Sequence, residues 1–298
     1  MKATIPFHPV LLCAVTFVCI SCRAQILDTA KIEQIIGAKG AMNTNENVFK
    51  ITVPRNDVKV SVDGWTMPPF MGLASWAAFT PGMDGTMVMG DTVLFQDEVN
   101  PVMSTALDNG LSVTALHNHF LYDEPRVYFM HIEGEGSAGD LAAAVKKVWD
   151  KIKEIRAANP IPATAFGNSA IPAKSSITGK TIEDILGAKG QANNGMFKVV
   201  VGRPAEMSGI KISKDMGVNT WAAFAGSDDN AIVDGDFAVH ESELQPVLKS
   251  LRHDGINIVA IHSHMTQETP RTLFLHYWGR GKAADLAASL KNAMAVTK

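Results

Sequence analysis

Apolar residues recur along the chain with two periods, one typical of strands and one typical of helices. In the C-terminal part, short β-branched and apolar runs predict five strands. These are residues 197–201, 219–225, 231–239, 256–264 and 271–278. Apolar positions at helical spacing predict three helices, over residues 181–186, 242–252 and 283–294. Ser242 fits a helix cap, and Gly187 and Gly255 fit helix stops.

The order of these elements, α-β-β-β-α-β-β-α, indicates the fold class. Helices and strands are mixed without the regular βα alternation of a parallel barrel, which excludes that architecture. We therefore expect an α+β fold in which helices cover one face of a mainly antiparallel sheet.

The pattern occurs twice in the chain. The run Trp-Ala-Ala-Phe begins at Trp76 and again at Trp221, and Gly-Asp begins at Gly90 and again at Gly235. Copies of this length indicate two homologous domains, each with its own sheet covered by helices, and not a short-period solenoid. The expected segments are a first repeat domain at 28–156, a Pro/Ala/Ser-rich linker at 157–179 and a second repeat domain at 180–298.

The first two dozen residues read as an export signal. In residues 1–24, Lys2 precedes an apolar run over residues 10–20 that is too short to span a bilayer. Ile-Ser-Cys ending at Cys22 resembles the end of a bacterial lipobox, and ordinary cleavage after Ala24 is the rival interpretation. We expect an exported protein of the periplasm or cell envelope, which contacts a membrane only through a lipid at Cys22.

Composition narrows the chemistry further. The formal net charge of −3 provides no basic surplus for nucleic acid, and we expect no nucleic-acid partner. All three cysteines, Cys13, Cys19 and Cys22, lie in the export segment. The rest of the chain has no disulfide framework and no thiolate ligand. A metal ion would have to be held by histidine, carboxylate or water.

Six of the nine histidines gather in two clusters of the pattern His-X-His, acid, Pro-Arg, His. The first cluster contains His117, His119, Asp123, Arg126 and His131, and the second contains His262, His264, Glu268, Arg271 and His276. Alternate side chains of a strand share a face, so each His-X-His pair points one way. The third histidine joins the pair only if the register of the following strand places it nearby.

Three histidines, with or without a carboxylate, can bind Zn²⁺ and leave a position for water. The same ligands suit Fe, Mn, Cu or Ni, so we expect a divalent metal with zinc as the first choice. Asp123 or Glu268 would act as a base, while Arg126 or Arg271 would hold an anionic group of the substrate. The competing interpretation is structural: the histidines pack in half-buried sheets, and each arginine pairs with its neighbouring acid.

Other shared residues have simpler interpretations. Turn and helix-start roles account for four shared acids, namely Asp91, Asp236, Glu98 and Glu243. Trp76 and Trp221 are predicted to lie in the core. Tyr277 and Trp278 flank His276, with no aromatic counterpart beside the first cluster. This asymmetry favours the C-terminal cluster if a single one binds a ligand.

The paired blocks also carry a family resemblance. Ala-Leu-His-Asn-His at residues 115–119 and Glu-Pro-Arg-Val-Tyr-Phe-Met-His at residues 124–131 recur in related form at residues 260–264 and 270–276. With the repeated Trp-Ala-Ala-Phe and Gly-Asp blocks, they resemble the bacterial LppY/LpqO lipoprotein family. That resemblance implies an exported, often lipid-anchored protein built from this repeated domain, and it implies no established activity.

The leading hypothesis is an exported protein that binds a divalent metal at one or both clusters. If it is an enzyme, metal-assisted hydrolysis is the natural class, and whether it is one stays open. One alternative is a non-catalytic protein of the envelope that binds a small-molecule or envelope ligand. Another is a cupin-like metal oxidoreductase or isomerase, although the glycine expected after the acid is missing. The sequence has neither a Gly-rich phosphate loop nor a Gly-X-Ser-X-Gly elbow.

Overall fold

A computed structural model describes residues 27–83, 85–167 and 170–297. The export signal expected at residues 1–24 lies outside the described residues. Within the described ranges, no helix is long and apolar enough to cross a membrane.

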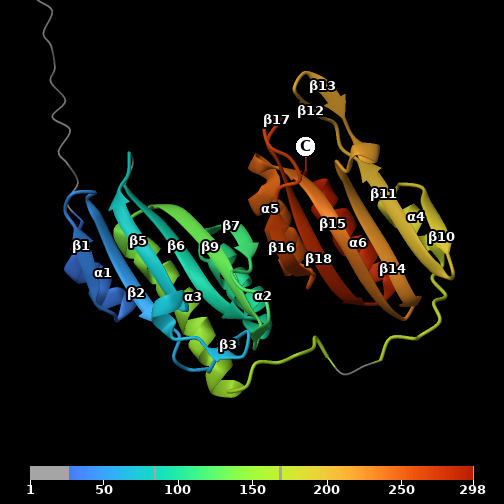
Figure 1. Cartoon of the computed structure of the whole chain (residues 1–298). Coiled ribbons are helices and arrows are strands. Elements are labelled where there is room, and N and C mark those ends of the chain that lie inside the picture. Colours follow the sequence, from blue (N-terminus) through green and yellow to red (C-terminus); the bar gives the residue numbers. More distant parts are fainter. Residues whose placement is uncertain (1–26, 84, 168–169, 298) are drawn as a thin grey trace, which may run out of the picture.

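The two halves of the chain repeat one order of elements (Figure 1). The first half contains α1 (Thr29–Ile36), β1 (Gly40–Asn43), β2 (Val48–Pro54), β3 (Ser61–Val62), β4 (Trp65–Thr66), η1 (Pro69–Met71), β5 (Ala74–Pro81), β6 (Thr86–Phe95), α2 (Gln96–Asp108), β7 (Ser112–His117), β8 (Asp123–Glu124), β9 (Val127–Gly136) and α3 (Ala138–Ala158). The second half contains α4 (Gly179–Leu186), β10 (Gly190–Asn193), β11 (Met196–Gly202), β12 (Ala205–Met207), β13 (Ile210–Ile212), η2 (Lys214–Met216), β14 (Asn219–Ser227), β15 (Asn230–His240), η3 (Glu241–Glu243), α5 (Leu244–His253), β16 (Asn257–His262), β17 (Glu268–Thr269), β18 (Thr272–Gly281) and α6 (Ala283–Ala295).

The main strands of both halves form one twelve-stranded sheet, and the expectation of a separate sheet in each repeat is wrong. The strand order is β1-β2-β5-β6-β9-β7-β16-β18-β15-β14-β11-β10. Every neighbouring pair in this sheet is antiparallel. The order of strands is symmetric about the junction of β7 and β16. At this junction, which we call the seam, Leu116 pairs with Ile261.

Helices cover one face of the sheet, and a single apolar core lies beneath them. Leu116 and Ile261 are both buried in this core, which contains residues of both repeats. Complete burial of one such side chain stabilises a fold by roughly 1.5–3 kcal/mol. Because neighbours along a strand point to opposite faces, His117 and His262 project from the face that the helices leave open.

Two reciprocal side-chain clamps hold the seam. The register of β7 and of β16 shifts once, just before Ala115 and just before Ala260. Asn100 on α2 donates to the Ile258 carbonyl at 3.2 Å and accepts from its N–H at 2.7 Å. Gln245 on α5 does the same for Val113, at 2.9 Å in both directions. Each repeat thus satisfies backbone groups that the irregular strand of the other repeat leaves unpaired.

Small additional sheets cover part of the open face. Strands β3, β4 and β8 form one of them, and β12, β13 and β17 form the other. Each covers a separate apolar cluster, which includes Phe129 in the first repeat and Phe274 in the second. These short strands, together with β1 and β10, were not predicted, because two to four residues are too few to show a period.

The longer elements of the second repeat agree with the sequence pattern, but the helix cap does not. Helix α5 follows the 3-10 turn η3, and Glu243 rather than Ser242 caps the start of that turn by accepting from the His240 N–H at 2.9 Å. In the first repeat, Glu98 accepts from the Phe95 N–H at 2.8 Å. The helix-start role predicted for both glutamates is therefore confirmed.

Candidate metal centre

The register of β16 and β18 places His276, the third histidine of the second cluster, beside His262, the first histidine of the same cluster. His262 pairs with Phe274, and His276 pairs with Ala260 two residues earlier on β16. The two histidines are therefore diagonal neighbours on one face. Their rings stack with centroids 4.9 Å apart and an interplanar angle of 8°.

His264 lies beyond the end of β16 and reaches back to the same point. Its ring stacks on Phe274 at a centroid distance of 3.5 Å. Its Nε2 lies 3.1 Å from His262 Nε2, and its Nδ1 lies 3.3 Å from the Gly217 carbonyl oxygen. The stacking on Phe274 and the Gly217 contact thus orient the ring toward His262.

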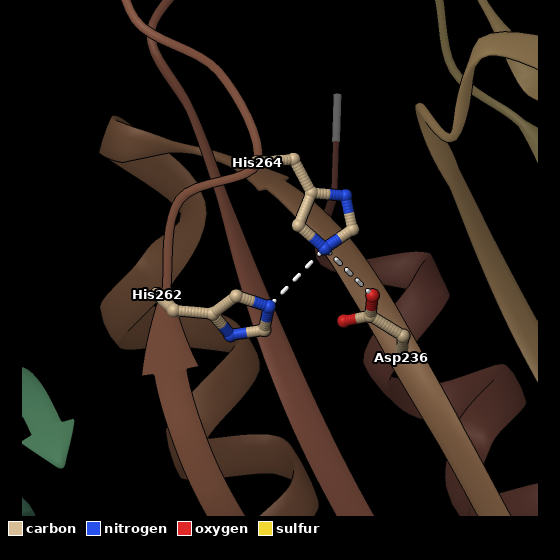
Figure 2. A group of neighbouring side chains, drawn as sticks. All are labelled: Asp236, His262 and His264. Carbon is tan, nitrogen blue, oxygen red and sulfur yellow. Dashed lines mark hydrogen bonds and ion pairs between the residues drawn. The ribbon is translucent and has the colours of Figure 1, made fainter.

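Asp236 completes the cluster from β15, where it pairs with His276 across the sheet. Its Oδ2 lies 3.3 Å from His264 Nε2 (Figure 2). Its Oδ1 is buried without a hydrogen-bond partner among the described residues. Burial raises the pKa of Asp236 above the usual range, against the lowering effect of His276, His264 and His262.

The turn and helix-start role predicted for Asp91 and Asp236 is therefore wrong. Both residues lie inside long strands, β6 and β15, and both are buried. The signal in the sequence was a Gly-Asp pair within a run that is otherwise mostly apolar, flanked on both sides by strand-forming residues. A carboxylate in such a run costs stability unless a partner compensates it, so an acid here points to a site.

These groups can hold a metal ion. One ligand atom from each of Asp236, His262 and His264 lies within 4.8 Å of the others, and no other such group occurs among the described residues. Burial lowers the pKa of His262, which favours the neutral imidazole that binds metals. His262 Nδ1 is also buried without a partner in the described chain. Unpaired buried polar atoms of this kind cost roughly 1–3 kcal/mol each, and a bound cation would compensate the carboxylate.

The first repeat has the same ring arrangement with fewer polar contacts. His117 and His131 stack at 5.1 Å, and His119 stacks on Phe129 at 3.4 Å. Asp91 pairs with His131, and burial raises its pKa. Burial lowers the pKa of His117 and of His119. In the second repeat, His264 contacts both His262 and Asp236. Within the described residues of the first repeat, however, no hydrogen bond or ion pair joins His119 to His117 or to Asp91.

The acids named from the motif, Asp123 and Glu268, lie in the short strands β8 and β17, and Arg126 and Arg271 lie in the loops that follow these strands. Glu268 Oε1 accepts from the Thr272 N–H at 3.0 Å and from Arg271 at 3.2 Å, and Arg271 is exposed. These contacts contribute to a pKa of Glu268 below the usual range, although its burial acts in the opposite direction. In the first repeat, Asp123 Oδ2 accepts from the Val127 N–H at 2.6 Å.

Glu268 and Asp123 thus hold their loops through backbone contacts. Arg126 is exposed beside Asp123, and both line a pocket of about 460 Å³. The structure therefore brings the histidines together with strand aspartates, whereas the motif pointed to Asp123 and Glu268.

The aromatic residues also differ from expectation. Trp76 and Trp221 are half-buried on the open face, each with a lysine ammonium over its ring, so the prediction that they lie in the core is wrong. Tyr277 is fully buried under the helices and donates to the Trp221 carbonyl at 2.8 Å, so it does not face the histidines. Trp278 shares the face of His276 and lines a neighbouring pocket of about 440 Å³.

Fold and site together define a duplicated α+β protein with one histidine and aspartate cluster in each repeat. The chain belongs to the family described as "Domain of Unknown Function (DUF1259)", which matches residues 30–151 and again residues 180–296. No curated protein matches the chain. Among solved structures, a double-ringed trimeric shell protein from the RMM microcompartment is 10% identical over 83% of this chain and 93% of that chain. Its TM-score is 0.16, and this likeness carries no argument.

Proposed function

We propose that the protein binds a divalent metal ion at the second cluster through Asp236, His262 and His264, with His276 as a fourth group. The observation that carries the proposal is the buried carboxylate of Asp236, whose Oδ2 lies 3.3 Å from His264 Nε2 and whose Oδ1 has no hydrogen-bond partner among the described residues (Figure 2). Two or three histidines and a carboxylate suit Zn²⁺ and also Fe²⁺, Mn²⁺ or Cu²⁺. Zinc is our first choice because it accepts this ligand set in tetrahedral geometry.

The stacked residues around the cluster would keep the ligands in place. Phe274 supports the ring of His264, and the Gly235 carbonyl lies 3.3 Å from His276 Nδ1. Contacts of this kind fix the tautomer and orientation of a ligating histidine. With His276 Nδ1 donating to Gly235, the Nε2 of that ring is left as the ligating atom.

The proposal extends to the kind of chemistry at the site. A bound divalent ion would lower the pKa of a coordinated water to about 7, which is the basis of metal-assisted hydrolysis. The motif predicted Glu268 as the base, but its Oε1 is held by Thr272 and Arg271, and its Oε2 is buried without a hydrogen-bond partner among the described residues. We therefore assign metal binding to this site, and hydrolysis stays a prediction without an assigned base.

Metal analysis of the purified protein tests the proposal. The chain would be stripped with a chelator, incubated separately with Zn²⁺, Mn²⁺, Fe²⁺ and Cu²⁺, desalted and measured by mass spectrometry. We expect retention of at least one of these ions, lost at the second cluster in His262→Ala. His253→Ala is the matched control, because His253 is exposed and lies outside both clusters. Retention of the same amount of metal in His262→Ala as in the control would contradict the proposal.

We also propose that the protein is exported and that it is a member of the LppY/LpqO lipoproteins. The support is the sequence of residues 1–24 and the repeated motif blocks. Expression of the whole chain in a bacterium, with cell fractionation and Cys22→Ser, tests both processing routes. Retention of the wild type in the cytoplasm would contradict export, and an unchanged membrane fraction in Cys22→Ser would contradict lipidation.

A further inference from the structure

A pocket of about 270 Å³ lies where the two repeats meet, and it shares no residue with either histidine cluster. The first residues of α2 and residues 163–166 form one side of it. Arg252 at the end of α5 and Asn257 at the start of β16 form the other side. We call it the seam pocket.

Arg252 has no acidic partner among the described residues, although it is half-buried. Its Nε donates to Ser104 Oγ at 3.1 Å, and its Nη1 donates to the Ile256 carbonyl at 2.7 Å and to Asn257 Oδ1 at 3.3 Å. All three acceptors are neutral. Burial lowers the pKa of Arg252 to about 10, so the side chain still carries its charge at neutral pH. A partly desolvated guanidinium without a counter-ion is unusual, because burying a charge is costly unless an opposite charge lies nearby.

Three donors on residues that line the seam pocket make no hydrogen bond within the described residues. They are Arg252 Nη2, the side-chain amide of Gln96 and the Nδ2 of Asn257. Arg252 and Asn257 are already joined by a hydrogen bond, which fixes them relative to each other. A guanidinium with neighbouring amide donors is the set that recognises carboxylate and phosphate oxygens.

The acid that lines the same pocket is already neutralised. Asp97 forms an ion pair with Arg156 and accepts from the Ala163 N–H at 3.0 Å through the same Oδ2. The Oδ1 of Asp97 is buried and has no hydrogen-bond partner among the described residues. Of the two charged residues in the lining, Arg252 is therefore the one without a counter-ion among the described residues.

We propose that the seam pocket binds a small oxyanion, a carboxylate or a phosphate, with Arg252 as its charged anchor and Gln96 and Asn257 as neutral donors. The residue that corresponds to Arg252 in the first repeat is Leu107, which is buried in the core. The site therefore belongs to the junction of the repeats and is not duplicated. It is independent of metal binding, and it would link α2, residues 163–166 and the second repeat through one ligand.

Titration of the metal-free chain with inorganic phosphate and, separately, with acetate tests the proposal. Chloride at matched ionic strength serves as the background, since a nonspecific screening effect would not saturate. Nitrogen-15 NMR of arginine Nε–H groups reports on Arg252 directly. We expect saturable binding of phosphate, acetate or both, with a shift of the Arg252 Nε–H signal. The anion that binds more tightly identifies the class.

Three variants locate the site. Arg252→Gln should weaken binding by at least about tenfold, because a charge-assisted hydrogen bond is lost. Gln96→Glu places a negative charge at an exposed position at the start of a helix, where acids are tolerated, and should weaken binding without unfolding the protein. Lys249→Gln on the exposed side of α5 should leave binding unchanged. Absence of saturable binding in the wild type, or wild-type affinity in Gln96→Glu, would overturn the proposal.

Discussion

The two repeats keep the same arrangement of histidines but differ in the strand positions beside it. Corresponding ring-centroid distances in the two repeats agree within 0.2 Å. This holds for the stacked histidine pair, for the His-X-His pair and for the phenylalanine ring under the second histidine. The cross-strand row next to the aspartate differs. In the second repeat it is Lys198, Ala223, Asp234 and Trp278, and in the first it is Lys50, Ala78, Met89 and Glu133.

This difference teaches that duplication alone does not explain the clusters. Two positions of the row have diverged, with Asp234 and Trp278 in the second repeat where the first has Met89 and Glu133, while the ring geometry of the clusters has not. In the second repeat, the row lines a pocket of about 440 Å³ with Trp278 at its edge. The two clusters then share one ring geometry and differ in the side chains that border it.

The largest expected effect is on metal affinity. Asp236→Asn should weaken binding at the second cluster by about 100-fold or more, because loss of a group that only orients a ligand already costs about 10- to 100-fold. Asp91→Asn should leave the second cluster unchanged. Competitive titration with a chelating dye measures both affinities. Equal losses in the two variants would erase the distinction between the clusters.

The same substitution should stabilise the metal-free protein, which separates loss of a ligand from loss of the fold. Asp236→Asn removes a buried carboxylate whose Oδ1 has no partner within the described residues. We expect a gain of about 1 kcal/mol in the free energy of unfolding. Urea unfolding in the presence of a chelator measures it, and a destabilised variant would show that the carboxylate is structural.

The glycine before each aspartate should respond unequally to substitution. A Cβ on Gly235 would lie 2.1 Å from Tyr277 Oη and 2.3 Å from the Trp221 carbonyl oxygen, whereas a Cβ on Gly90 would lie 2.8 Å from the Trp76 carbonyl oxygen and 3.0 Å from Ile132. Gly235→Ala should therefore cost about 3 kcal/mol of stability and Gly90→Ala about half of that. Thermal unfolding of both variants gives the comparison, and an equal cost would show that Tyr277 moves aside easily.

Glu268 makes a contribution to stability that depends on pH. Because the folded pKa of Glu268 is lowered, its contribution to stability is present above the unfolded value of about 4.3 and is lost as the pH falls through the folded pKa. Glu268→Gln should cost about 1–2 kcal/mol at pH 7 and almost nothing well below pH 4. Among the described residues, Asp123 forms no ion pair with an arginine, so Asp123→Asn should lower the free energy of unfolding at pH 7 slightly less than Glu268→Gln does. Urea unfolding at both pH values measures these differences, and a cost that persists in acid would contradict the assignment.

The smallest expected effect concerns the diverged row. Trp278→Glu reproduces the residue of the first repeat at that position and adds a negative charge beside the cluster. We expect binding of azide to the metal-loaded second cluster to weaken about two- to threefold, consistent with roughly 0.5 kcal/mol between charges about 10 Å apart in water. Glu133→Trp should strengthen azide binding at the first cluster by a similar factor. Azide titration followed by the absorption of a Co²⁺-loaded protein tests both, and no change in either would mean that the row does not influence the ion.

Much of the fold could be predicted from the sequence because the long elements carry a clear period. The α+β class, the duplication and the strands that contain His262 and His276 follow from apolar runs. The shared sheet could not be predicted, since nothing in the chain marks the pairing of Leu116 with Ile261. That pairing depends on two apolar residues that resemble any others in a core.

The site was predicted in part for a similar reason. The histidines stand out because few residues bind metals and their spacing suits strands. Asp236 did not stand out, because a single acid after a glycine is most often found in a turn. Glu268 was chosen for its place in the motif, although a carboxylate near the start of a strand can hold backbone N–H groups, as it does for Thr272.

The position of a bound ion tests the central claim most directly. A crystal structure of the protein loaded with Zn²⁺ or Co²⁺, with anomalous scattering recorded at the metal edge, would locate it. We predict a peak within about 2.0–2.2 Å of a carboxylate oxygen of Asp236 and of ring nitrogens of His262 and His264. A loaded protein whose anomalous peak lies away from Asp236, or one with no peak at either cluster, would contradict it.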